Sequence, residues 1–169
     1  KGAVIASGGS ATIEEVGLLN YIKTHSEEYT FIDRSIAKNE EEKRQIHAKA
    51  ILSDYYLMST NAFTMDGQLV NIDGNGNRVS ALCYGPKHVV IITGMNKLTP
   101  SVEDAYKRIR QDACPPNCVR LGLPTPCSKT GVCGDCMSAS SICDLCVTTR
   151  MSRYPDRIHI IIVGEELGY

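Results

Sequence analysis

Short runs of apolar, β-branched residues alternate along this chain with stretches that have helical spacing, and this alternation permits few architectures. The run 2–6 is followed by a Gly-rich turn at 7–10, and then by apolar residues three positions apart from Ile13 to Ile22. That spacing predicts a helix. Strands that alternate with helices form a parallel sheet covered by helices. We therefore expect an α/β fold: a three-layer, Rossmann-like architecture with a mostly parallel sheet and a Cys-rich loop as an insertion.

Apolar, β-branched runs and helical spacing also predict the remaining elements. A helix over 13–25 would begin with a capping box formed by Thr12 and Glu15. The turn residues 65–67 indicate a hairpin between the strands on either side. The expected elements are, in chain order, strands 2–6 and 30–34, a polar helix 38–52, strands 54–60, 68–73, 78–85 and 88–94, a helix 101–113 capped by Ser101, and a final buried strand 157–164.

Size and charge narrow the class of protein. The 169 residues are 43% hydrophobic, which suffices for one core, so we expect a single domain over 1–169 that contains a Cys-rich metal loop at 114–146. The net charge is −1 and no basic stripe is present, so nucleic acid is not expected as a partner. No apolar run approaches the ~20 residues of a membrane span, so no membrane insertion is expected. Lys1 leads directly into a strand, which indicates that an upstream segment is missing.

Seven of the eight cysteines lie between positions 114 and 146. Disulfide frameworks of secreted proteins spread their cysteines along the chain, so this crowding favours reduced thiols, a cytoplasmic location and a bound metal. Four converging thiolates suit a tetrahedral zinc or an iron–sulfur cluster, and the spacing leaves the choice between them open. The expected ligands are Cys127, Cys133, Cys136 and Cys143. Cys83 is expected to be buried in a strand, and the cysteines without an assigned role are Cys114, Cys118 and Cys146.

Three polar turns are candidate binding elements. In the Gly-rich turn 7–12, glycines and hydroxyls precede a helix start, a combination that favours an anion. A turn capped by its own serines explains the pattern equally well. The turns 59–67 and 73–78 are rich in Ser, Asn, Asp and Gly, which β-turns favour in any protein. If instead both turns line a pocket at the strand ends, Arg78 would bind a ligand carboxylate through two parallel hydrogen bonds.

Several of these segments together resemble the lactate-utilisation (LUD) domain family, which includes the LutC-type subunit of bacterial lactate-oxidation systems. The resemblance covers nearly the whole chain. It lies in 8-GGSAT-12 with Gly17, in the long block 59–97, in 105–110, in 126-PCSKTGVCGDC-136 through Cys143, and in the ending 158–169. The helical segment that usually begins members of this family has no counterpart in this sequence.

The resemblance implies a fold similar to that of sugar-phosphate isomerases, glucosamine-phosphate deaminases and CoA-transferases. In that superfamily the Gly-rich turn after the first strand binds a phosphate or carboxylate, so the resemblance favours a pocket lined by the polar turns. The anion site that it implies consists of Ser7, Gly8, Gly9, Ser10, Thr12, Asn61, Thr64, Asp66, Gly67, Asp73, Asn77 and Arg78. The catalytic carboxylate of the isomerases and transferases has no secure counterpart here, so no catalytic residue is assigned.

For the cysteines, the resemblance implies a 4Fe-4S cluster rather than zinc, held by the four expected ligands. The chain would then be a redox subunit of a system that oxidises lactate or a related hydroxy-acid, with redox partner subunits and a small organic acid anion as ligand. Two other functions stay open: a stand-alone enzyme acting on a sugar phosphate or CoA ester with a structural zinc, and a ligand-sensing protein whose thiols act as a redox switch. Whether identical chains form a homo-oligomer is also open.

Overall fold

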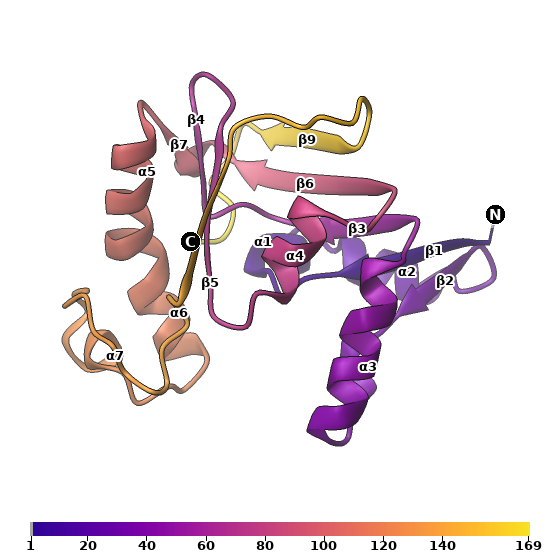
Figure 1. The fold of residues 1–169 in the computed structure, drawn as a ribbon, viewed down its shortest axis with the longest axis horizontal. Coiled ribbons are helices and arrows are strands. Elements are labelled where there is room, and N and C mark those ends of the chain that lie inside the picture. The colour runs from indigo at the N-terminus through magenta and orange to yellow at the C-terminus, as the bar shows by residue number, and fades with distance from the viewer. Residues whose placement is uncertain (1) are drawn as a thin grey trace.

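The computed structural model describes residues 2–169 and contains two β-sheets with helices packed around them (Figure 1). The larger sheet has the strand order β2-β1-β3-β6-β9, and every neighbouring pair in it is parallel. Its strands are β1 (Ala3–Ser7), β2 (Tyr29–Ile32), β3 (Tyr55–Met58), β6 (His88–Gly94) and β9 (Ile158–Val163). The expected α/β class and mostly parallel sheet are confirmed.

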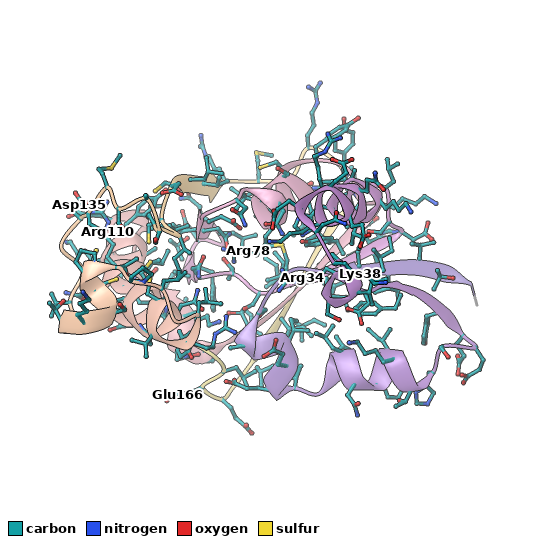
Figure 2. The ribbon with its side chains drawn as sticks, turned by 90° about the horizontal axis from the view of Figure 1, so that it is seen from below. Arg34, Lys38, Arg78, Arg110, Asp135 and Glu166 are labelled. Carbon is teal, nitrogen blue, oxygen red and sulfur yellow. The ribbon has the colours of Figure 1, made fainter. Side chains whose placement is uncertain are left out.

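Helices cover both faces of the larger sheet, which gives the expected three layers (Figure 2). Successive side chains of a strand point to opposite faces. Ile5 and Leu57 therefore pack with Ile22 on one face, and their neighbours Ala6 and Tyr56 pack in a second cluster on the other. The helices of the first face are α1 (Ala11–Glu15) and α2 (Leu18–Thr24), and those of the second are α3 (Glu40–Ile51) and α4 (Asn77–Cys83).

The smaller sheet has the order β7-β4-β5-β8 and carries the Cys-rich segment on one side. Its strands are β4 (Ala62–Thr64), β5 (Leu69–Asp73), β7 (Leu98–Thr99) and β8 (Leu145–Thr149). Val70 and Ile72 pack against helical residues Ala105 and Ile109, and the same cluster includes Cys114. The helical elements are α5 (Val102–Arg108), a π-helical turn (Ile109–Ala113), α6 (Cys114–Arg120) and α7 (Pro126–Thr130). Segment 114–146 is therefore more than a loop, since it begins with α6 and runs into β8.

Two helices occupy the range where one helix was expected over 13–25, and the first of them has a different capping residue. Gly17 lies between α1 and α2 with a φ of 71°, a left-handed conformation that glycine adopts without a steric penalty. The side chain that caps α1 belongs to Ser10, which accepts a hydrogen bond from the Ile13 backbone N–H at 3.3 Å. The prediction of a capping box formed by Thr12 and Glu15 was wrong, because both side chains contact the segment before Tyr169 instead.

One strand and one strand pairing predicted in the middle of the chain were also wrong. Residues 78–85 were expected to form a strand, but helix α4 occupies most of this range, and its buried residues Val79 and Leu82 lie three positions apart. The alternation of Val79 with Ala81 imitated a strand. The expected hairpin also has a different first strand, because β5 pairs with β4 whereas β3 belongs to the larger parallel sheet.

The final strand is present but is not buried. β9 forms one edge of the larger sheet, and the exposed fractions of Ile160, Ile161 and Ile162 are 41%, 50% and 51%. The apolar run predicted a covered strand, but no helix lies over this edge in Figure 1. No helix within residues 2–169 has the length and apolar character needed to cross a membrane.

Arg157 joins the start of β9 to the end of α4. The side chain is 9% exposed, and its guanidinium donates hydrogen bonds to the backbone oxygens of Ala81 at 2.7 Å, Leu82 at 2.7 Å and Pro86 at 3.2 Å. A cation at these carbonyls also interacts favourably with the carboxyl end of the helix.

We expect Arg157→Met to lower the free energy of unfolding by about 3 kcal/mol, since it leaves three buried carbonyl groups without their donor. Urea denaturation of both proteins measures this difference. Arg153→Met is the matched control, because Arg153 is exposed, and it should change the free energy of unfolding by less than about 0.5 kcal/mol. Equal effects of the two substitutions would contradict the assigned role of Arg157.

Candidate functional site

The carboxyl ends of three neighbouring strands, β1, β3 and β6, meet at one edge of the larger sheet. Each is followed by a polar turn: the Gly-rich turn after β1, residues 59–61 after β3, and the 3₁₀ turn Met95–Lys97 after β6. Open α/β sheets bind ligands at this edge. A cavity of about 310 Å³ lies there, a volume that suits a small molecule. Residues from the turns after the strands of the larger sheet, from β5 of the smaller sheet and from α6 line it, and they include Arg34, Ser59, Lys97, Cys114, Arg120 and Tyr169.

Seven of the twelve residues expected in an anion site line this cavity: Gly9, Ser10, Thr12, Asn61, Asp73, Asn77 and Arg78. Ser7 and Gly8 come just before them in the chain, and the Gly8 backbone N–H is used in a hydrogen bond to the Leu57 carbonyl. The other three, Thr64, Asp66 and Gly67, form the turn between β4 and β5 and are not among the cavity residues. Their polar atoms serve the turn itself, because the Thr64 hydroxyl donates to the Asp66 carboxylate.

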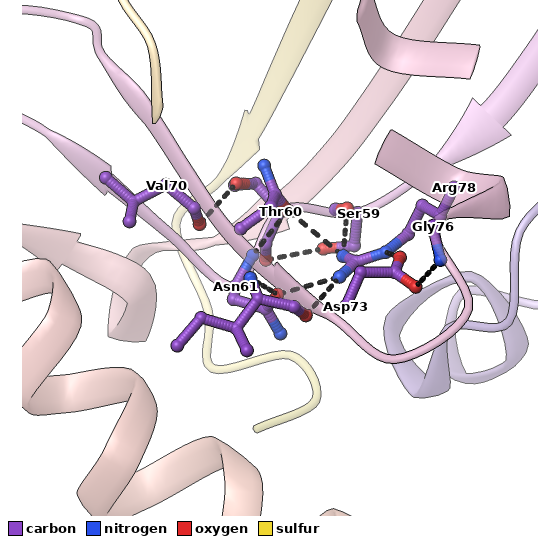
Figure 3. A network of polar contacts seen from close by, with 9 residues as sticks. Ser59, Thr60, Asn61, Val70, Asp73, Gly76 and Arg78 are labelled. Carbon is purple, nitrogen blue, oxygen red and sulfur yellow. Dashed lines mark hydrogen bonds and ion pairs between the residues drawn. The ribbon is translucent and has the colours of Figure 1, made fainter. Parts of the chain in front are cut away.

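Arg78 is the centre of a hydrogen-bond network beneath the cavity (Figure 3). Its Nε donates to Asp73 Oδ2 at 3.1 Å, its Nη1 to Asn71 Oδ1 at 3.0 Å, and its Nη2 to Asn61 Oδ1 at 2.8 Å. Two further bonds go to the backbone oxygens of Ser59 and Ile72, at 3.2 and 2.9 Å. A guanidinium has five N–H donors, so all five are used by protein acceptors.

The saturation of Arg78 changes the role expected for it. A ligand carboxylate that took two of its donors would have to displace protein acceptors that are already in place. Arg78 and Asp73 are also an ion pair with exposed fractions of only 13% and 10%, which neutralises both charges. In this structure Arg78 supports the cavity wall, and the cavity cations without a carboxylate partner are different residues.

Those cations are Arg34, Lys97 and Arg120, none of which the sequence analysis singled out. All three line the cavity. Within the described residues 2–169, none of them forms an ion pair with a carboxylate. Gly9 leaves room for Arg34, because a Cβ atom on Gly9 would lie 2.5 Å from Arg34 Nη2. The cavity therefore has excess positive charge that an anionic ligand would neutralise.

Lys97 is the most buried of these cations, with an exposed fraction of 3%. Its Nζ donates hydrogen bonds to Thr12 Oγ1 at 2.8 Å and to Ser59 Oγ at 3.2 Å. Burial disfavours the ammonium form, and the positive charges of Arg108 and Arg78 disfavour it further, so the pKa of Lys97 is lowered from 10.5 to about 8. Glu15 acts weakly in the opposite direction.

The segment Glu165–Tyr169 closes the side of the cavity next to Lys97. The Leu167 N–H donates to Asn96 Oδ1 at 3.2 Å, and the Leu167 carbonyl accepts from the Thr12 hydroxyl at 3.3 Å. A Cβ on Gly168 would lie 3.3 Å from Lys97 Nζ, so this glycine permits the segment to pass directly beside the amine. The segment thus contributes to the exclusion of water from Lys97.

The cysteines form close pairs that differ from the expected set of four. Cys143 Sγ lies 3.3 Å from Cys114 Sγ, a residue that had no expected role. The hydrogen bond between the two thiols lowers the pKa of Cys143 to about 7, and the same bond, together with burial, raises that of Cys114. Burial raises the pKa of Cys118, which lies one helical turn after Cys114 on α6, and Cys127 raises it further.

The other two expected ligands, Cys133 and Cys136, are partly exposed in the irregular stretch between α7 and β8. An ion pair from Arg110 Nη2 to Asp135 Oδ1 at 3.0 Å attaches this stretch to the π-helical turn (Figure 2). Within the described part of the chain, no three His, Cys, Asp or Glu side chains come together as they would around a metal ion. Cys83 was expected to be buried in a strand, but it is exposed at the end of α4.

The geometry can now be set beside known proteins. A model of the LUD domain family matches residues 1–163. The chain belongs to the LUD domain family. Membership of this family associates the chain with lactate utilisation. Among solved structures, a DUF162 family protein from Deinococcus radiodurans is similar over 96% of this chain and 88% of that chain, with 12% sequence identity and a TM-score of 0.39. No curated protein gives a significant match.

The residues of this LUD domain that sequence reasoning missed come either from strand ends or from helix α6. Lys97 directly follows β6, as Ser10 and Asn61 follow β1 and β3, so the rule that ligands bind at the carboxyl ends of parallel strands points to it. Arg120 and Cys114 reach the cavity from helix α6, and the contact of α6 with the strand ends has no local sequence pattern.

We expect Gly9→Ala to weaken the binding of a small carboxylate by roughly tenfold, because the new methyl group displaces the Arg34 guanidinium from the cavity. L-lactate is a suitable probe, and isothermal titration calorimetry measures its affinity. Gly164→Ala is the matched control, because a Cβ at Gly164 meets nothing within 4 Å. An unchanged affinity in Gly9→Ala would exclude Arg34 from the recognition of the anion.

We expect the stability of the wild-type LUD domain relative to Lys97→Met to rise between pH 8 and pH 10.5. The folded pKa of Lys97 is lower than that of the unfolded chain, so between these two values the unfolded state binds more protons, and the folded state gains stability as pH rises. The full gain is about 3 kcal/mol. Denaturant unfolding of both proteins at each pH measures it, and other titrating groups cancel in the difference. A difference that stays constant with pH would contradict a lowered pKa.

Proposed function

We propose that this LUD domain binds a small organic acid anion in the cavity and holds a 4Fe-4S cluster in its Cys-rich segment, as a redox subunit of a system that oxidises lactate or a related hydroxy-acid. The observation that carries the proposal is the position of Cys114. This residue lines the cavity and also contacts Cys143 in the Cys-rich segment. The Cys114 thiol therefore belongs both to the cavity wall and to the Cys-rich segment.

The charge of the cavity supports an anionic ligand. Arg34, Lys97 and Arg120 carry positive charge into it, while its Asp73 is already paired with Arg78. Hydroxyl groups of Ser10, Thr12 and Ser59 add neutral hydrogen-bonding groups. A carboxylate is the natural partner of such a set, since it gains charge-assisted hydrogen bonds and neutralises buried charge.

The cysteines fit an iron–sulfur cluster by the chemistry of their donor atoms. Thiolates are the usual ligands of such clusters, and segment 114–146 contains seven cysteines, all of them with free thiols. Cys127, Cys133, Cys136 and Cys143 would hold the cluster, and Gly131 and Gly134 have open space around them, so the chain between these ligands is unhindered. When bound, the cluster supplies one-electron transfer. The chain's own contribution would be to hold Cys143 beside the cavity through its contact with Cys114.

The alternative is a structural zinc in a stand-alone small-molecule enzyme. The pair Cys133 and Cys136 has the two-residue separation that zinc sites use, which favours this alternative. Both proposals place the protein in a reducing compartment such as the cytoplasm. Both also treat residues 1–169 as one domain. The redox proposal requires, in addition, partner subunits with which electrons are exchanged.

We expect protein purified without oxygen to contain about four irons and four sulfides per chain, with a broad absorption near ~400 nm that dithionite bleaches. Iron, zinc and acid-labile sulfide analysis measures this directly. Cys133→Ser should abolish the bound iron and sulfide, because it removes one of the four proposed ligands.

Cys83→Ser is the matched control, since Cys83 is exposed and lies far from segment 114–146 in the chain. It should retain the full iron and sulfide content. About one zinc per chain without sulfide would overturn the redox function and support the structural zinc instead. The absence of any bound metal in protein handled without oxygen would overturn both.

A further inference from the structure

Lys97 combines deep burial with the lack of a counter-ion, which is rare for a lysine. Lysines are almost never fully buried unless they are paired. Lys97 is 3% exposed, and within residues 2–169 its Nζ has only the hydroxyls of Thr12 and Ser59 as hydrogen-bond partners. No part of the fold described above requires an amine at this place. The side chain also lines the ligand cavity, so its Nζ is available for chemistry there.

The surroundings of Lys97 make its neutral amine more accessible than that of an exposed lysine, because they lower its pKa. Arg108 is fixed nearby by hydrogen bonds to the backbone oxygens of Asn96 and Asn61, both at 2.9 Å, and Arg78 is fixed by its five bonds. Desolvation by burial, followed by the charges of these two immobile cations, brings the pKa of Lys97 to about 8, against the weak opposite effect of Glu15. A lysine becomes a nucleophile when burial and neighbouring cations lower its affinity for the proton.

We propose that Lys97 captures a 2-oxo acid in this cavity as a covalent imine. The Nζ lone pair attacks the carbonyl carbon and a C–N bond forms. The carbonyl oxygen then leaves as water, and its two hydrogens come from the amine. The product is a C=N bond between Lys97 and C2 of the acid, and addition of water reverses the step. No oxidant or reductant is required.

Two features of the cavity select a 2-oxo acid among carbonyl compounds. Arg34 and Arg120 line the cavity without carboxylate partners, so they can hold the carboxylate of the acid while its carbonyl group faces Lys97. The hydroxyls of Thr12 and Ser59, at 2.8 and 3.2 Å from Nζ, can carry the protons that move between nitrogen and oxygen. The segment that passes Lys97 at Gly168 limits the access of water, which favours the imine over its hydrolysis.

This inference rests on the proposed anion cavity and deepens it, because a 2-oxo acid is what the oxidation of a 2-hydroxy-acid produces. It does not depend on the metal. A chain that holds such a product covalently would couple the oxidation to a later step at the neighbouring carbon, since an imine that has gained a proton on its nitrogen withdraws electrons from that carbon more strongly than the ketone does.

The test is reductive trapping. Wild-type protein is incubated with pyruvate and sodium cyanoborohydride, and intact-mass and peptide analysis locate the adduct. We expect one reduced pyruvate per chain, on Lys97, and protection of that site by excess L-lactate. Peptide mapping of the wild-type protein makes the result independent of whether a variant folds.

Lys97→Met should lose the adduct completely, with its fold checked by circular dichroism. The matched control is Lys49→Met, which removes an exposed lysine of α3 and should trap pyruvate as the wild type does. Adducts spread over surface lysines, or none, would overturn the inference. Calorimetry without the reductant separates the two proposals: pyruvate or lactate that binds without trapping overturns only the imine, while the absence of any binding overturns the anion cavity as well.

Discussion

The hydrogen bonds of Arg78 connect the parts of the molecule that form the cavity. One side chain joins the turn after β3, strand β5 and the start of helix α4 through its contacts with Ser59, Asn71 and Asp73. The ion pair with Asp73 is largely buried, and removal of either member of such a pair typically costs about 3 to 5 kcal/mol. Because Arg78 neutralises the carboxylate of Asp73, the remaining cations of the cavity keep their charge for a ligand.

The elements that could be predicted are those whose sequence pattern reports local geometry. The buried strands β1, β3 and β6 follow from their apolar, β-branched runs, and the cap of α5 follows from Ser101, which accepts a hydrogen bond from the Asp104 N–H. The strand predicted at 78–85 failed because Val79, Ala81 and Cys83 alternate by coincidence. Helix α4 starts there after a local turn, in which Asp73 Oδ1 accepts from the Gly76 N–H, and Arg78 anchors the helix through long-range bonds to Ser59 and Asn61.

The candidate site was predictable to the extent that it follows from strand ends. The turn with Gly9 and Ser10 and the turn with Asn61 both reach the cavity, as their polar residues indicated. The charge of Arg78 and its place in a polar turn suggested that it binds a ligand. How many protein acceptors surround its guanidinium depends on the folded structure. The pairing of Cys143 with Cys114 was equally inaccessible, because it depends on how α6 packs against the smaller sheet.

Gly168 has a φ of 59°, and a Cβ at this position would meet Thr12 Oγ1 at 2.5 Å and Lys97 Nζ at 3.3 Å. Three residues from distant parts of the chain therefore occupy one small volume. In the course of evolution, a larger side chain at 168 becomes tolerable only where the lysine and the threonine have been replaced by smaller residues. These positions are thus expected to vary together, and a lineage that abandons the buried amine should also lose the steric part of the constraint at 168, where the positive φ still favours glycine.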